Sequence, residues 1–235
     1  MNKTILIGGC SFSQTQNWPK VIKSDGWIPW TDLFKREYGS FYNIVNTAKS
    51  SFGQSKIVES ILKELIARNF NVDFVIIQWS AVGRAYAVNH KDLDLDFITN
   101  QHEYVLGTDK LGWTTDALNQ IDYSFYINSL NQIYLLKTLL KEKNIPFKMF
   151  WGWQQITDTI EGITPLLDLI YDDDFWRWET HGGMREYIVS KLGEEDGCGG
   201  PGLHPTTNGQ KYFYNTIIKN FINSLDNSKN FRIFV

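Results

Sequence analysis

Residues 72–79 (VDFVIIQW) form an almost continuously apolar run that is rich in β-branched residues. A strand without polar alternation is buried on both faces, which is typical of the centre of a parallel sheet. Other short apolar runs are predicted as strands too, and segments with helical periodicity separate them. The expected strands are residues 4–8, 44–46, 72–79 and 146–151, and the expected helices are residues 30–38, 55–68, 123–143 and 206–225, with Thr206 or Thr207 as the N-cap of the last helix. This alternation predicts an α/β fold, a three-layer α/β/α sandwich around a parallel, flavodoxin-like sheet.

The chain of 235 residues is long enough for one large domain, and it shows no internal repeat, low-complexity tract or clean linker. We therefore expect a single domain over residues 1–235, with insertions near residues 85–120 and 152–200. The first insertion is polar and irregular, and the second is loop-rich and acidic. Because each follows the carboxyl end of a predicted strand, we expect both to overhang the functional site from one side.

The charge balance excludes several classes of partner. With 23 basic and 26 acidic residues the net charge is −3, so we expect no generic binding of nucleic acid or anionic lipid. No apolar run is long enough to span a membrane, and the one near the N-terminus is too short for a signal peptide. Two cysteines, Cys10 and Cys198, cannot form a disulfide scaffold or a four-cysteine zinc site. These features predict a soluble cytoplasmic protein and leave open whether it is a homo-oligomer.

Ligands of parallel α/β sheets bind at the carboxyl ends of the strands, so the residues directly after each predicted strand are the informative ones. They are residues 9–13, 46–54, 79–84 and 151–153, together with the loop 202–205 before the last helix. Aromatic residues make up 15% of the chain, and several Trp lie beside Gly or polar residues. Flat aromatic side chains suit sugar rings as ligands, although core packing accounts equally well for many of them.

Four short blocks at these strand ends resemble those of the SGNH/GDSL hydrolase family, of which the chain would be a divergent member. The first block of the family is Gly-Asp-Ser, and Gly9-Cys10-Ser11 stands in its place. The resemblance implies that Ser11 is the nucleophile, held on a tight turn close to a base. Ser13 fits the spacing less well, and Cys10 stands where the family has a non-nucleophilic Asp.

The next two blocks supply the oxyanion hole in this family. Asn46 and Ala48 match the pattern Asn-x-Ala-x-x-Gly, but Ser51 stands at the Gly position. The main-chain N–H of Ser51 survives that change. In the third block Ser80 stands in the position of the family's Asn, and its hydroxyl can donate one hydrogen bond. The resemblance therefore implies an oxyanion hole made by Ser11, Ser51 and Ser80.

The last block of the family is Asp-x-x-His, in which His is the general base and Asp orients it. His204, followed by Pro205, matches the base. Pro201 stands at the Asp position, and proline cannot orient an imidazole. The orienting group would then be Asp196, Glu195 or a main-chain carbonyl, and the sequence leaves this choice open.

The resemblance implies serine-dependent hydrolysis of an ester, with no cofactor and no metal. The aromatic-rich loops favour an O-acyl ester of a glycan, or another small-molecule ester, as the substrate. The residues expected to bind it are Trp79, Arg84, Trp151 and Trp153. The alternative is a weak or inactive SGNH-like module that binds glycans or has a structural role, for example in a virus particle; the missing Asp favours it. A metal site built from the aspartates 172–174 and His181 is disfavoured, because successive acids point in different directions.

Overall fold

The computed structural model describes residues 3–15, 27–50, 52–80, 84–85, 104–105, 115–153, 163–179, 182–199 and 204–228. For residues 84–85, 104–105, 115–126 and 224–228 it describes the backbone alone. The described residues contain a five-stranded sheet in the order β2-β1-β3-β6-β7, in which every neighbouring pair is parallel. Its strands are β1 (Lys3–Gly8), β2 (Tyr42–Asn46), β3 (Phe74–Trp79), β6 (Phe147–Trp151) and β7 (Phe175–Trp176). The predicted central position of β3 is confirmed, and the carboxyl ends of these strands meet at one edge of the sheet.

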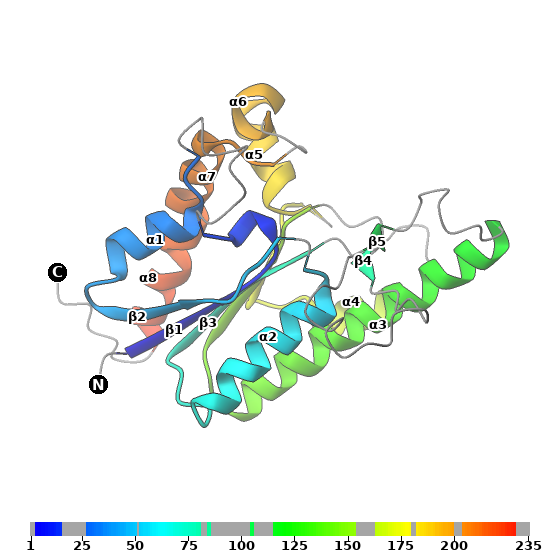
Figure 1. Cartoon of the computed structure of the whole chain (residues 1–235), viewed down its shortest axis with the longest axis horizontal. Helices are drawn as coiled ribbons and strands as arrows, with labels where there is room; N and C mark the ends of the chain where they lie inside the picture. The colour runs from blue at the N-terminus through cyan, green and yellow to red at the C-terminus, as the bar shows by residue number, and fades with distance from the viewer. Residues whose placement is uncertain are drawn as a thin grey trace, which may run out of the picture.

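Helices cover both faces of the sheet (Figure 1). One face packs against α1 (Trp30–Tyr38), α5 (Met184–Leu192), the short α6 (Glu194–Cys198), α7 (Thr207–Phe213), the π-helical turn η6 (Tyr214–Ile218) and α8 (Lys219–Ser228). The other face packs against α2 (Gln54–Ala67), α3 (Thr115–Glu142) and α4 (Thr164–Ile170). A separate antiparallel pair joins β4 (Arg84–Ala85) to β5 (Tyr104–Val105). The predicted three-layer α/β/α sandwich is therefore confirmed.

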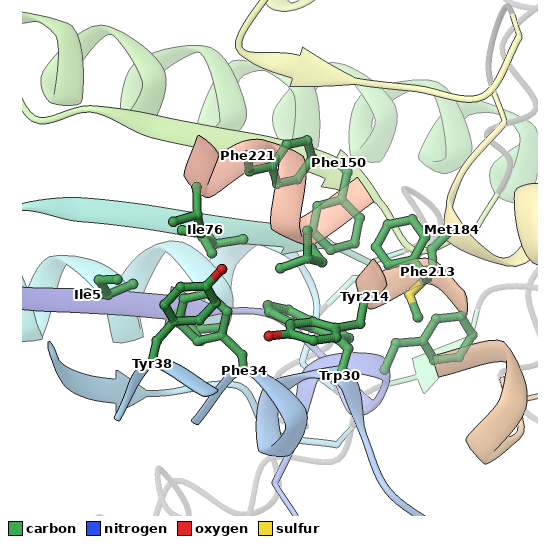
Figure 2. Packing of buried hydrophobic residues seen from close by; sticks show 14 of the residues in the cluster. Ile5, Trp30, Phe34, Tyr38, Ile76, Phe150, Met184, Phe213, Tyr214 and Phe221 are labelled. Atoms are coloured by element: carbon green, nitrogen blue, oxygen red, sulfur yellow. The ribbon is translucent and has the colours of Figure 1, made fainter. Parts of the chain in front are cut away.

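The alternation of side chains along β3 explains why its sequence is apolar throughout. Phe74 and Ile76 belong to the core under α1 and α7, whereas Val75 and Ile77 belong to the core under α2 and α3. Successive side chains of a strand point to opposite faces, so a strand covered on both sides needs an apolar residue at almost every position. Much of the first core is aromatic: Figure 2 shows Phe150 among the rings of Trp30, Phe213 and Phe221, with centroids 5.1 to 6.2 Å away.

The structure differs from the sequence-based expectation mainly after residue 152. That segment is not simply loop-rich, because its described part contributes β7 to the sheet and α4, α5 and α6 to its faces. The strand β7 has only two residues, which is too few for a recognisable apolar pattern. The last predicted helix is present, but the π-helical turn η6 divides it. Most of residues 85–120 lies outside the described residues. That this insertion overhangs the site therefore stays a prediction.

The acidic run at 172–174 binds lysines of neighbouring elements. Lys137 of α3 is 3% exposed, and its ammonium group donates to the carbonyls of Leu169 and Ile170 at the end of α4. The carboxylate of Asp172 lies 2.9 Å from the same Nζ and 2.7 Å from that of Lys141. A lysine that caps the last carbonyls of a helix stabilises its C-terminus, and here it also joins α4 to α3. Among the described residues no group of three or more His, Cys, Asp or Glu side chains is arranged to hold a metal ion.

We expect Asp172→Asn to lower the free energy of unfolding at pH 7 by about 1 kcal/mol, because the charged Lys137 loses its carboxylate partner. Burial by itself would raise the pKa of Asp172, but hydrogen bonds from Lys141 and Lys137 outweigh it and hold the pKa below the ordinary value of 3.8. The contribution of this carboxylate is therefore fully present above pH 3.8 and is lost as the pH falls through the lowered pKa.

Urea unfolding between pH 7 and pH 2 measures this effect. The wild-type protein should lose more stability over that range than Asp172→Asn does. Asp173→Asn is the matched control, because Asp173 is an exposed neighbour in the same run. Equal pH dependence of the wild type and Asp172→Asn would contradict the prediction.

No helix in the described part of the chain is both long enough and apolar enough to cross a membrane.

Candidate active site

Ser11 begins a single 3-10 turn, η1 (Ser11–Ser13), just after the end of β1. Cys10 precedes the turn as its N-cap residue, and the N–H of Ser13 donates to the Cys10 carbonyl at 3.0 Å. The amide of Ser11 is the first of this turn, where main-chain N–H groups have no acceptor within the helix. The Ser11 side chain itself is only 2% exposed. The turn therefore places one hydroxyl and one amide together at the carboxyl end of β1.

His204 meets Ser11 from the far end of the sequence. Its Nε2 lies 2.8 Å from Ser11 Oγ, although the two residues are 193 positions apart. This distance is that of a hydrogen bond, and it lies within the reach required between a nucleophile and its general base. In the tautomer with an unprotonated Nε2, the Ser11 hydroxyl donates and the imidazole can accept its proton. The structure thus brings the two predicted catalytic side chains into contact.

The loop that carries His204 is tied to neighbouring elements on its other side. Thr206, one of the two predicted candidates, is the N-cap of α7, and its hydroxyl accepts the N–H of Gly209 at 3.1 Å. The N–H of Thr206 donates to the Gly197 carbonyl of α6 at 2.8 Å. A Cβ on Gly209 would lie 2.2 Å from that same carbonyl oxygen, so only glycine allows α7 to approach α6 this closely. The indole of Trp27 donates to the carbonyl of Pro205 at 2.9 Å and holds the loop from the α1 side.

A buried amide, Gln210 of α7, links the helix after His204 to the turn that carries Ser11. Its Oε1 accepts the N–H of Trp30 at 3.0 Å, and its Nε2 donates to the Phe12 carbonyl at 3.4 Å. The side chain is fully buried, so these bonds replace its contacts with water. Gln210 was not among the predicted site residues. A signal was present, however, because Gln210 lies three residues before Phe213 and so on the apolar face of an amphipathic helix, where an amide needs partners in the core.

A second buried amide, Gln78 of β3, lies under the turn that carries Ser11. Its Oε1 is 3.2 Å from Cys10 N, 3.2 Å from Cys10 Sγ and 3.2 Å from Ser13 Oγ. Ser13 Oγ in turn accepts the indole N–H of Trp30 at 3.1 Å. The Ser13 hydroxyl is thus engaged in structural hydrogen bonds, which leaves Ser11 as the hydroxyl of this turn that contacts His204.

The second block of the resemblance packs directly against the same turn. Asn46 Nδ2 donates to the Ser13 carbonyl at 2.8 Å, and Asn46 Oδ1 accepts the N–H of Ala48 at 2.9 Å. The N–H of Lys49 donates to the Gly9 carbonyl at 3.2 Å. Asn46 therefore joins the loop after β2 to the loop after β1. Ser51, expected to give an oxyanion amide, lies outside the described residues, and its role stays a prediction.

No family model matches the sequence, and no curated protein matches it. Solved structures do match over nearly the whole length. The psychrotrophic esterase EstA from Pseudoalteromonas sp. is similar with a TM-score of 0.51 at 13% identity, and the match covers 96% of this chain and 100% of that chain. The chain has the SGNH hydrolase fold. A lipase/acylhydrolase from Enterococcus faecalis is also similar, with a TM-score of 0.48 at 12% identity, and the match covers 94% of this chain and 96% of that chain. An acetyl-xylooligosaccharide esterase from Geobacillus is similar with a TM-score of 0.49 at 13% identity, and the match covers 94% of this chain and 95% of that chain.

In this SGNH fold the third block lies at the end of β3. Ser80 is fully buried, its carbonyl accepts Gln54 Nε2 at 2.7 Å, and its hydroxyl has no partner within the part of the chain that the structure describes. Its proposed role as an oxyanion donor stays a prediction. Arg84 lies in β4, where the structure describes the backbone only, so its part in substrate binding also stays a prediction.

The prediction of four substrate-binding residues is wrong for two of them. Trp79 and Trp151 are the last residues of β3 and β6, and both side chains are fully buried in the core under α2 and α3. They therefore have no surface to offer a ligand. Trp153, which is half-buried, stacks on Phe12 at 4.0 Å between ring centroids, and Phe12 lies edge-on to the His204 ring at 5.0 Å. Trp153 is thus the expected tryptophan that is linked to His204, through the ring of Phe12.

Which group orients the His204 imidazole stays a prediction. Asp196 and Glu195 are exposed residues of α6, and Pro201 lies outside the described residues. The main-chain carbonyl of Asp196 accepts a hydrogen bond from the Thr206 hydroxyl, so this segment lies beside the His204 loop. His181 is also outside the described residues. Of the two thiols, Cys198 is fully buried, and burial raises its pKa to about 12, so it is not a nucleophile at neutral pH.

Proposed function

We propose that this protein is a serine-dependent ester hydrolase with Ser11 as the nucleophile and His204 as the general base. The observation that carries the proposal is the 2.8 Å contact between His204 Nε2 and Ser11 Oγ at the carboxyl edge of the sheet. A fold that hosts many activities does not define a reaction, whereas a hydroxyl in contact with an imidazole is the arrangement of a nucleophile and its base. The hydroxyl of Ser13 is already engaged by Gln78 and Trp30, which supports Ser11 over its neighbour.

The proposed reaction has two steps of the same kind. Ser11 Oγ attacks the ester carbonyl while its proton passes to His204 Nε2, and the oxyanion is bound by the amides of Ser11 and Ser51 and by the Ser80 hydroxyl. The C–O bond to the alcohol breaks, the imidazolium returns the proton to the leaving alkoxide, and the acyl group stays on Ser11. Water then attacks the acyl-enzyme, with His204 again accepting and returning one proton, and the carboxylic acid leaves.

The proposed substrate is an O-acyl ester of a glycan or another small ester. The half-buried Trp153 ring contacts Phe12, whose ring contacts His204, and this aromatic group supports a flat, weakly polar substrate near the scissile bond. Because Ser11 is only 2% exposed, the proposal favours a small acyl group. The second candidate is a weak or inactive module that binds glycans or has a structural role, and the replacement of the family's Asp by Pro201 favours it.

A small alkyl fluorophosphonate tests the assignment of the nucleophile. The reagent phosphonylates serines that are activated by a neighbouring base, so after proteolysis we expect a single adduct on the peptide that carries Ser11. Mass spectrometry locates the adduct, and Ser11→Ala should remove it. The matched control is Ser190→Ala, because Ser190 is an exposed serine of α5 whose hydroxyl donates to the Tyr187 carbonyl of its own helix.

The other outcomes separate the alternatives. An adduct on Ser13 or Cys10 would show that the nucleophile is misassigned. No adduct on the folded protein would favour the binding-module function.

A further inference from the structure

The side chain of Gln78 is held in one orientation beneath the nucleophile turn. Its Nε2 donates to the Trp79 carbonyl at 2.7 Å, so Oε1 points to the turn. There Oε1 accepts from the N–H and the S–H of Cys10 and from the Ser13 hydroxyl. These donors lie on both sides of Ser11 in the sequence. One fully buried carbonyl oxygen thus holds the turn before and after the proposed nucleophile.

Two glycines make room for this amide. A Cβ on Gly152 would lie 2.3 Å from Gln78 Nε2, and a Cβ on Gly9 would lie 3.1 Å from Gln78 Oε1. The side chain is therefore enclosed by main chain from the residue after β6 on one side and from the loop after β1 on the other. An enclosed amide whose nitrogen and oxygen each have a hydrogen-bond partner has little freedom to move, and the turn that it binds shares this rigidity.

The identity of Cys10 fits the same arrangement. The resemblance predicts Asp at this position, but a carboxylate here would face the Oε1 of Gln78 across a distance of about one hydrogen bond, with no proton between two acceptors. The thiol of Cys10 can instead donate its S–H to Oε1, at 3.2 Å. Gln78 and Cys10 are therefore complementary as a pair.

We infer that Gln78 is a positioning residue of the active site, which fixes Ser11 Oγ against His204 Nε2 by holding the turn through Cys10 and Ser13. The kinetic part of this inference rests on the proposed function. A nucleophile displaced by about 1 Å loses on the order of 10²-fold in rate, so a loose turn affects the chemical step far more than substrate binding.

Gln78→Met removes the hydrogen bonds and keeps the length of the side chain. For a small aryl ester we expect kcat per titrated active site to fall by about 10²-fold, with KM changed by less than about threefold. Gln132→Met is the matched control, because Gln132 lies on α3 and its Oε1 is buried without a partner among the described residues. A kcat within about twofold of wild type, or a loss explained by a smaller folded fraction, would overturn the inference.

Gln78→Glu gives a pH profile that a purely structural role would not produce. A neutral carboxyl group offers a carbonyl acceptor to the turn and an O–H donor to the Trp79 carbonyl, as the amide does. Burial raises the pKa of such a group, and its ionisation removes the donor. The ratio of variant to wild-type kcat should therefore be highest at low pH and fall as the pH rises. A flat ratio in a protein that stays folded contradicts the inference.

A readout that needs no turnover separates this inference from the proposed function. In Gln78→Met the Cys10 amide should exchange with deuterium at least about tenfold faster by NMR, because its hydrogen-bond acceptor is gone. If the wild-type protein shows no Ser11-dependent hydrolysis, the proposed function fails, and the exchange rate still decides whether Gln78 holds the turn. Unchanged exchange at Cys10 would overturn the inference even in an active enzyme.

Discussion

Replacing Ser11 or His204 with alanine is expected to lower kcat for a small aryl ester by about 10⁴-fold or more. Ser11→Ala removes the proposed nucleophile, and His204→Ala removes the proposed base, whose Nε2 lies 2.8 Å from Ser11 Oγ. Because the two side chains act as a unit, the double variant should be little slower than either single variant. Initial rates with p-nitrophenyl acetate, corrected for buffer hydrolysis, measure the effect.

Controls distinguish loss of chemistry from loss of structure. Ser190→Ala should keep full activity, and thermal unfolding should show that the Ser11 and His204 variants are folded. Single variants that retain more than about a tenth of wild-type kcat would contradict the assigned roles, given the size of effect expected for such a pair. A wild-type rate that does not exceed that of buffer would identify the binding module instead.

Asp196→Asn is expected to lower kcat by up to about 10⁴-fold with little change in KM. An orienting carboxylate holds the imidazole in the tautomer that can accept the serine proton, and it stabilises the imidazolium formed in the transition state. Asp196 is the proposed source because its segment bonds the loop after His204 through Thr206. Steady-state kinetics on the aryl ester, compared with His204→Ala, measure the contribution.

Glu195→Gln is the matched control, because Glu195 is the exposed neighbour of Asp196 in α6. It should change kcat by less than about twofold, as expected for an exposed charge outside the catalytic unit. If Glu195→Gln lowers kcat and Asp196→Asn does not, Glu195 is the residue that orients His204. If both substitutions are silent while His204→Ala is inactive, a main-chain carbonyl orients the imidazole.

Strong local sequence patterns were sufficient to predict most of the strands and helices. The apolar run at residues 72–79 predicted the central strand, and the periodicity at residues 30–38 predicted α1 with the bounds observed, Trp30–Tyr38. The two-residue strand β7 was missed, because two residues carry no period. It forms only where the backbone of Phe175 and Trp176 pairs with β6.

At several positions the sequence did not predict which face of the sheet a side chain takes. Trp79 and Trp151 end their strands at the edge where the site lies, but an apolar run buried on both sides does not reveal which face a given residue takes. The structure turns both towards α2 and α3. Gln78 takes the other direction, and its signal was a single amide within a buried apolar strand, which requires hydrogen-bond partners that only the folded chain provides.

The sequence by itself determined which segments become strands and helices, and that Ser11 and His204 follow strand ends or precede a helix, because these properties depend on neighbouring residues. Only the tertiary structure decided that Ser11 and His204 are in contact. Their 2.8 Å approach depends on hydrogen bonds between residues far apart in the chain, through Gln78 beneath the turn and through Gln210 between the turn and α7. Such contacts arise when a parallel sheet brings its strand ends together, and no local pattern encodes them.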